Sequence, residues 1–117
     1  MIDLKKIPIF GTLNTSDMEE VKPYLIPAAF KKKEVIFSEG DSSDWLYIVT
    51  KGKVKITKLS QNGREIILEI ISPMDFFGGV AVIRGFPYPA NAVAMDDAEV
   101  LKISRSNLMR ILDRFPN

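Results

Sequence analysis

Apolar and polar residues alternate along the middle of the chain with a period of two, the pattern of a β-strand with one buried face. The alternation runs through residues 53–58 and again through residues 65–71. Between these segments lies Asn62-Gly63, and an Asn-Gly pair strongly favours the tight turn of a β-hairpin. The pattern therefore predicts two antiparallel strands joined by this turn.

Further short apolar segments predict more strands. Residues 45–50 form a continuous apolar and aromatic run, as expected of a strand that is buried on both faces. Residues 34–37 end at a Glu-Gly-Asp turn, and two aspartates separate residues 90–95 from residues 98–103. Many short strands separated by turns predict a mainly β fold, which is a sandwich, a jelly roll or a barrel.

A helix is predicted towards each end of the chain. Near the N-terminus, Asn14 or Thr15 caps a helix with an acidic first turn, and Pro23 kinks or breaks it. Near the C-terminus, Ser104 caps a second helix with an apolar stripe. The stripe consists of Leu108, Ile111, Leu112 and Phe115. The sequence thus predicts a small β-roll with flanking helices, in a single domain over residues 1–117.

Composition excludes several classes of function. The chain has 117 residues, a net charge of +1, and neither His nor Cys. The near-neutral charge gives no general attraction to nucleic acid or to an anionic membrane. Disulfides, thiolate or imidazole catalysis, and zinc or haem sites built on these side chains are excluded. We therefore expect no enzyme, no metal site and no cofactor, in a cytoplasmic protein without a membrane segment.

Two charged clusters are interpreted as solvated surface. Lys31-Lys32-Lys33 is typical of a strand edge that lysine protects against aggregation, rather than of a contact with a polyanion. Asp96-Asp97 is interpreted as a turn, rather than as a carboxylate pair for catalysis or for a hard cation.

Residues 76–95 have the outline of a phosphate-binding cassette. Gly78-Gly79 forms a turn, a short apolar segment follows, and a Gly-x-Pro turn leads to a strand of small residues. Backbone N–H groups at the start of a short helix after the glycines form a generic anion site. The nearby cation is Arg84, which we interpret as facing solvent rather than reaching back into the site.

Several motifs resemble those of cyclic-nucleotide-binding domains. Residues 33–41 resemble the family's run that ends in Glu-Gly-Asp, residues 46–54 its next strand pair around a glycine, and residues 75–78 the start of its phosphate-binding cassette. Residues 7–10 resemble the N-terminal entry of the bacterial branch. From the order and spacing of these motifs, the chain is identified as a cyclic-nucleotide-binding-like effector domain of the Crp–Fnr family of bacterial transcriptional regulators. The resemblance implies a double-stranded β-helix, or jelly roll.

The resemblance also implies how the parent protein is built. Regulators of this family join an effector β-roll to a long dimerisation helix and a helix-turn-helix domain. In relatives, a sequence like Phe115-Pro116-Asn117 leads into the long helix. We therefore interpret the chain as a fragment that lacks the dimerisation helix and the helix-turn-helix. The parent is expected to be a homodimer that contacts DNA only through the absent C-terminal domain.

Cyclic-nucleotide binders of the family place a Glu and an Arg in the cassette, for the ribose hydroxyl and the cyclic phosphate. Here Gly79 stands at the Glu position, Tyr88 or Pro89 at the Arg position, and Asn91 at a Ser/Thr position. Losing one partner of a buried charged pair costs about 2–5 kcal/mol, so we expect no useful binding of cyclic AMP or cyclic GMP. The candidate ligand-binding residues are Gly78, Gly79, Val80, Ala81, Arg84, Tyr88, Pro89, Ala90 and Asn91.

The sequence leaves more than one function open. The first is a ligand-sensing domain that binds a small organic effector other than a cyclic nucleotide and signals to the missing DNA-binding domain. The second is a ligand-free structural or interaction module of the same fold, with Phe86 or Tyr88 filling a collapsed cassette. Tyr88 is interpreted as an aromatic that covers the roll slightly ahead of a ligand contact. A cyclic-nucleotide-regulated domain of a protein other than a transcription factor is the remaining alternative.

Overall fold

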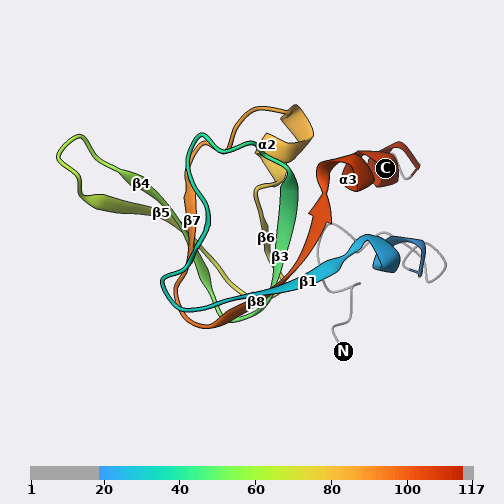
Figure 1. The fold of residues 1–117 in the computed structure, drawn as a ribbon, viewed down its shortest axis with the longest axis horizontal. Coiled ribbons are helices and arrows are strands. Elements are labelled where there is room, and N and C mark those ends of the chain that lie inside the picture. The colour runs from blue at the N-terminus through green and yellow to red at the C-terminus, as the bar shows by residue number, and fades with distance from the viewer. Residues whose placement is uncertain (1–18, 115–117) are drawn as a thin grey trace.

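Two four-stranded antiparallel sheets form the body of the molecule in the computed structural model, which describes residues 19–114 (Figure 1). The first sheet has the order β1-β8-β3-β6 and consists of β1 (Ile26–Phe30), β8 (Ala98–Ser104), β3 (Trp45–Lys51) and β6 (Phe76–Phe77). The second has the order β2-β7-β4-β5 and consists of β2 (Val35–Phe37), β7 (Asn91–Ala94), β4 (Val54–Leu59) and β5 (Glu65–Ile71). The helical elements are η3 (Lys22–Tyr24), α2 (Gly79–Arg84) and α3 (Arg105–Arg114). The prediction of a mainly β fold is confirmed.

The predicted hairpin is formed by β4 and β5. Its turn holds Gly63 at a φ of +82°, and the N–H of Gly63 donates to the carbonyl of Ser60 at 3.0 Å. The ladder shifts register between Ile56 and Thr57, so that Leu68 bulges from β5. The hairpin projects from the body of the molecule, at the left of Figure 1. Large apolar side chains of β5 are about half exposed: Ile66, Ile67, Leu68 and Ile70.

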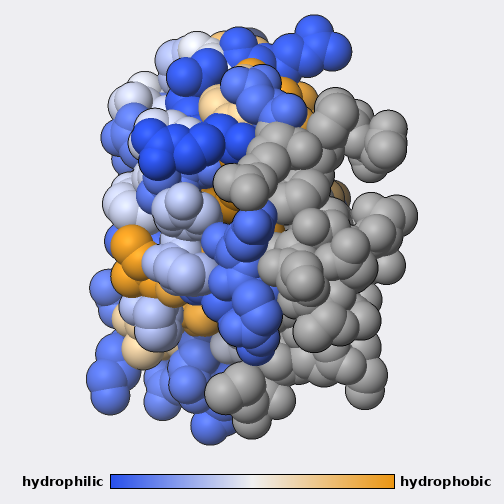
Figure 2. Space-filling view, turned by 90° about the vertical axis from the view of Figure 1, so that its right-hand side faces the viewer, coloured by the Kyte–Doolittle hydropathy of each residue, from blue (hydrophilic) through white to orange (hydrophobic). Residues whose placement is uncertain are grey.

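The other end of the molecule carries α3. The N–H of Asn107 donates to Oγ of Ser104 at 3.2 Å, which confirms the predicted cap. Leu108 and Ile111 of the predicted stripe are buried, whereas Phe115 lies outside the described residues. Hydrophilic side chains cover most of the coloured surface at this end (Figure 2). Within residues 19–114, no helix is long and apolar enough to cross a membrane.

Pro23 interrupts the first helical segment, as the sequence predicts. Residues 19–21 are α-helical, and the chain then tightens into the 3-10 helix η3, which contains Pro23 in its first turn. Val21, just before the break, is fully buried in the core. The predicted caps Asn14 and Thr15 lie outside the described residues.

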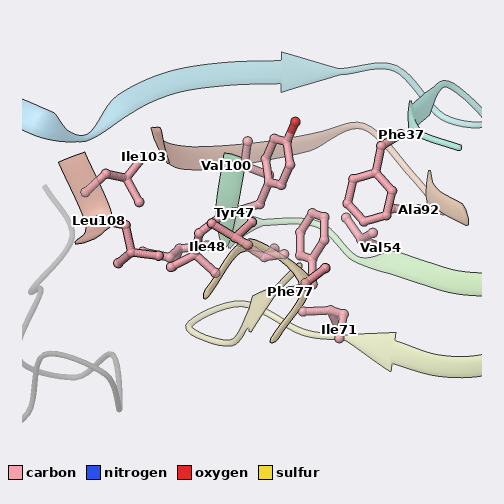
Figure 3. Packing of buried hydrophobic residues seen from close by; sticks show 14 of the residues in the cluster. Phe37, Tyr47, Ile48, Val54, Ile71, Phe77, Ala92, Val100, Ile103 and Leu108 are labelled. Atoms are coloured by element: carbon pink, nitrogen blue, oxygen red, sulfur yellow. The ribbon is translucent and has the colours of Figure 1, made fainter. Parts of the chain in front are cut away.

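Strand β3 is buried on both faces, as its continuous apolar run predicts. Leu46, Ile48 and Val49 are fully buried, and Tyr47 is only 6% exposed. Figure 3 shows Ile48 beside Ile103 and Leu108, whereas Tyr47 lies towards Phe77 and Phe37. The rings of Phe37, Tyr47 and Phe77 pack against one another between the sheets. Tyr47 is stacked on Phe77 at 5.0 Å between ring centroids. The core therefore extends through β3 and holds α3 against the first sheet.

The charged clusters lie in turns. Lys31-Lys32-Lys33 joins β1 to β2 instead of forming a strand edge, and Lys33 has a φ of +75°. The predicted strand edge is wrong because the backbone of this segment forms a turn that is hydrogen-bonded to another turn. The N–H of Lys32 donates to Oδ1 of Asp97 at 3.0 Å. Asp96 accepts in the same way from the N–H of Lys53 at 2.8 Å. The two aspartates therefore fasten turns, and among residues 19–114 no acidic cluster suits a metal ion.

We expect Gly52→Ala to destabilise the domain by about 1–3 kcal/mol more than Gly63→Ala does. Both glycines have positive φ, but a Cβ at Gly52 would lie 2.5 Å from Oδ1 of Asp96, whereas one at Gly63 meets nothing within 4 Å. Urea unfolding of the two variants measures the difference. Equal losses would show that the turn beside Asp96 yields without cost.

Candidate functional site

A cavity of about 350 Å³ lies between the second sheet and α2. Strands β2, β4, β5 and β6 contribute Phe37, Ile56, Glu69, Ile71, Phe76 and Phe77 to its lining. The cassette contributes Gly78, Gly79, Val80, Ala81, Tyr88, Pro89 and Ala90. All the candidate residues except Arg84 and Asn91 therefore line a single cavity. Their role in ligand binding stays a prediction.

The structure does not bring Arg84 and Asn91 to this cavity. Arg84 is the exposed last residue of α2, at the end remote from the cavity lining. Asn91 begins β7, and its Oδ1 accepts from the N–H of Glu39 at 2.8 Å. Its amide oxygen therefore braces a turn of the second sheet.

Glycines fix how α2 enters the cavity wall. Gly78 caps the helix at a φ of +85°, and a Cβ there would lie 3.2 Å from the ring of Tyr88 and 3.3 Å from the carbonyl oxygen of Trp45. The close approach of these groups requires glycine. The first N–H groups of α2, from Gly79 to Ala81, have no acceptor within the helix and border the cavity.

Gly79, which by the family resemblance stands where nucleotide binders carry Glu, is packed closely. It is buried, and a Cβ there would lie 3.2 Å from Cδ1 of Leu46 and 3.3 Å from Cε2 of Phe76. A longer side chain would have to displace these two apolar side chains. Packing therefore favours glycine at this position.

Tyr88 is held by its ring and by its hydroxyl. The ring stacks on Phe37 at 3.6 Å between centroids and 5° between planes, and only 3% of the residue is exposed. The hydroxyl donates to the carbonyl of Trp45 at 2.5 Å and accepts from the N–H of the same residue at 3.2 Å. Burial raises the pKa of the Tyr88 phenol to about 12. The ring borders the cavity, but the hydroxyl is already bonded to the backbone.

The Glu-Gly-Asp turn after β2 clasps the end of the cassette. The N–H of Gly40 donates to the carbonyl of Tyr88 at 2.9 Å, and the N–H of Tyr88 donates to the carbonyl of Asp41 at 3.0 Å. Oδ2 of Asp41 accepts from the N–H of Ser38 at 2.9 Å, which shapes the turn. Two motifs that are far apart in sequence thus form a single brace behind the cavity.

The C-terminal end of α2 is bonded to the start of α3. Nε of Arg105 donates to the carbonyl of Val82 at 2.9 Å, and the N–H of Arg105 donates to the carbonyl of Asp44 at 2.8 Å. A Cβ at Gly85 would lie 3.2 Å from the guanidinium, so glycine leaves room for this contact. The helix that borders the cavity is therefore joined directly to the last helix of the chain.

Glu69 lines the cavity, although the sequence pattern did not predict it as a candidate. It is the charged residue of the cavity lining, and within residues 19–114 no Lys or Arg lines the cavity. Glu69 and Ile71 are two residues apart on β5, so both side chains lie on the same face of the strand. The sequence pattern does not tell which face borders a cavity. Neither Phe86, which is 40% exposed and outside the lining, nor the stacked Tyr88 closes the cavity.

Comparison with known proteins supplies the family. The profile of the cyclic nucleotide-binding domain matches residues 27–115. A CRP-like cAMP-activated global transcriptional regulator of Mycobacterium tuberculosis is 30% identical over 90% of this chain and 47% of its own length. The cyclic AMP receptor protein of Thermus thermophilus is 27% identical over 97% of this chain and 52% of its own. The chain thus spans about half the length of these relatives.

A solved structure agrees with these matches. The N-terminal domain of a transcriptional regulator from Streptomyces coelicolor superposes with a TM-score of 0.86 at 28% identity, over 97% of this chain and 80% of that one. The predicted jelly roll is confirmed, and so is the resemblance to Crp-type effector domains.

We expect the free energy of unfolding to fall as the pH rises from 10 to about 12. The Tyr88 phenol has a pKa near 10 in the unfolded chain and about 12 in the folded domain, so in this range deprotonation favours the unfolded chain. Two pKa units correspond to about 2.7 kcal/mol. Tyr88→Phe should remove most of this loss, whereas Tyr24→Phe should retain it. Burial also raises the pKa of Tyr47, which contributes equally to both variants. Chemical unfolding across this pH range measures the slopes, and parallel slopes for the two variants would contradict the assignment.

Proposed function

The chain belongs to the cyclic nucleotide-binding domain family, and we propose that it is the effector-sensing domain of a bacterial transcriptional regulator. The names of its relatives and the similar N-terminal domain of a regulator support this role. The family is a ligand-binding regulatory one. DNA binding then belongs to a part of the parent outside this chain, and we expect the parent to be a cytoplasmic homodimer.

The effector in this proposal is a small molecule other than a cyclic nucleotide. The charge of the cavity lining carries this point: Glu69 is there, and among the described residues no Lys or Arg accompanies it. A cyclic phosphate would therefore face a carboxylate without a counter-charge. Gly79 also offers no carboxylate to a ribose hydroxyl, and its close neighbours leave little room for one.

A ligand-free interaction module is the second candidate. The Tyr88 hydroxyl is bonded to Trp45, so few polar side-chain groups remain free in the cavity. The cavity is nevertheless open, and its volume of about 350 Å³ lies in the range of ligand sites. This observation favours the effector-sensing role.

Calorimetric titration with cyclic AMP and cyclic GMP is expected to show no binding in the low-micromolar range. Loss of the two recognition residues costs about 2–5 kcal/mol each, and every 1.4 kcal/mol is about tenfold in affinity. A low-micromolar dissociation constant for either nucleotide would overturn the choice of effector while leaving the sensing role intact.

A metabolite panel tested by thermal shift should contain compounds that stabilise the domain, by about 2.7 kcal/mol at a hundredfold excess over the dissociation constant. The stabilisation should be lost in Val80→Trp, because Val80 lines the cavity and is 69% exposed, so that a larger ring fits and blocks the mouth. Ile83→Trp is the matched control, since Ile83 lies on the same helix, is 41% exposed and does not line the cavity. Equal stabilisation of both variants, or of neither, would remove support for an effector in this cavity.

A further inference from the structure

We propose that the effector is a mainly apolar molecule whose polar group is a cation or a hydrogen-bond donor seated against Glu69. This inference rests on the proposed function, since it names the chemical class that the sensing cavity takes. It is carried by the walls of the cavity, by the free carboxylate of Glu69, and by the way in which neighbouring charges are already paired.

The walls of the cavity are apolar on every element that contributes to them. Phe76 and Phe77 come from β6, Ile56 from β4, Ile71 from β5, and Phe37 from β2. The cassette adds Val80, Tyr88, Pro89 and small residues. Phe76 and Val80 remain 39% and 69% exposed. Burying such surface under a ligand is favourable at about 25 cal/mol per Å², so an apolar body is the natural occupant.

Glu69 is the polar side chain that remains available in this lining. It pairs with Ile56 across the β4–β5 ladder, and both residues line the cavity. Tyr88 is the other polar side chain in the lining, and its hydroxyl already donates to the carbonyl of Trp45. An ionised carboxylate only accepts hydrogen bonds, so its complement is an ammonium, a hydroxyl or an N–H group.

The two lysines of β4 are each paired with another acid. Nζ of Lys55 lies 2.7 Å from Oε1 of Glu65, and Nζ of Lys58 lies 3.7 Å from Oε2 of Glu39. In contrast, Glu69 has no ion pair or side-chain hydrogen bond within residues 19–114. An anionic ligand would therefore meet an uncompensated negative charge, whereas a cation would supply the missing partner.

Three ligands with the same apolar body test the charge preference. Naphthylethylamine, naphthylethanol and naphthylacetate carry a cation, a neutral donor and an anion, and methyl signals of Ile56, Ile71 and Val80 report their binding by NMR. Because Glu69 is an exposed residue of β5, we expect the amine to bind about threefold to tenfold more tightly than the carboxylate, with the alcohol between them. Glu69→Gln should bring the amine to within about twofold of the alcohol. Glu99→Gln, which removes one charge from β8 beside Lys51, should leave the order unchanged.

The outcomes separate this inference from the proposed function. If the carboxylate binds most tightly at these methyl groups, the N–H groups of α2 outweigh Glu69, and the inference fails while the sensing role stands. If Glu69→Gln and Glu99→Gln weaken the amine equally, overall charge rather than Glu69 selects the ligand, and the inference also fails. If none of the three shifts the cavity methyl signals, while a thermal-shift panel also gives no ligand, both proposals fail.

Discussion

The ring of Tyr88, packed flat on Phe37 and bonded through its hydroxyl to the backbone of Trp45, is the contact on which the cavity depends. It joins the cassette to strands of both sheets, because Phe37 ends β2 and Trp45 begins β3. Since the Glu-Gly-Asp turn also clasps Tyr88 through Gly40 and Asp41, the backbone around this ring has few ways to move. Tyr88 and Phe37 both line the cavity, so this contact forms part of its wall.

The same contact bears on the proposal that the effector is not a cyclic nucleotide. The family resemblance offers two positions for the phosphate-binding Arg, and at one of them the ring of Tyr88 packs in the core. The position that aligns with Glu is a glycine pressed against Leu46 and Phe76. Apolar contacts thus surround Tyr88 and Gly79, and the carboxylate in the cavity lining, that of Glu69, comes from the hairpin. Under the proposal, ligand selectivity would follow from the shape of the apolar walls and from the charge of Glu69.

Features that depend on local chemistry could be predicted from the sequence. The Asn62-Gly63 turn, the Ser104 cap and the doubly buried strand around Ile48 each follow from a few adjacent residues. Strand β1 was not predicted as a separate element, because it is an edge strand that contains Pro27 and pairs with β8 alone. Long-range placement explains the other differences.

Spacing in the cassette placed Arg84 and Asn91 among the candidates, although Arg84 was interpreted as facing solvent. Arg84 does lie exposed at the far end of α2, and the side chain of Asn91 is bonded to the N–H of Glu39. Glu69 was overlooked because the cavity forms only when β5, α2 and the turn around Pro89 meet. No window of sequence contains all three of these segments.

Helix α2 borders the cavity at its start, and near its end the carbonyl of Val82 accepts a hydrogen bond from Arg105 of α3. Thermodynamic linkage makes any coupling between the cavity and α3 reciprocal. A ligand that shifts the equilibrium of α3 by some factor must have its own affinity shifted by the same factor when α3 is constrained from outside. If binding in the cavity is coupled to α3 in this way, a change in what contacts α3 would change the affinity of the cavity for its ligand.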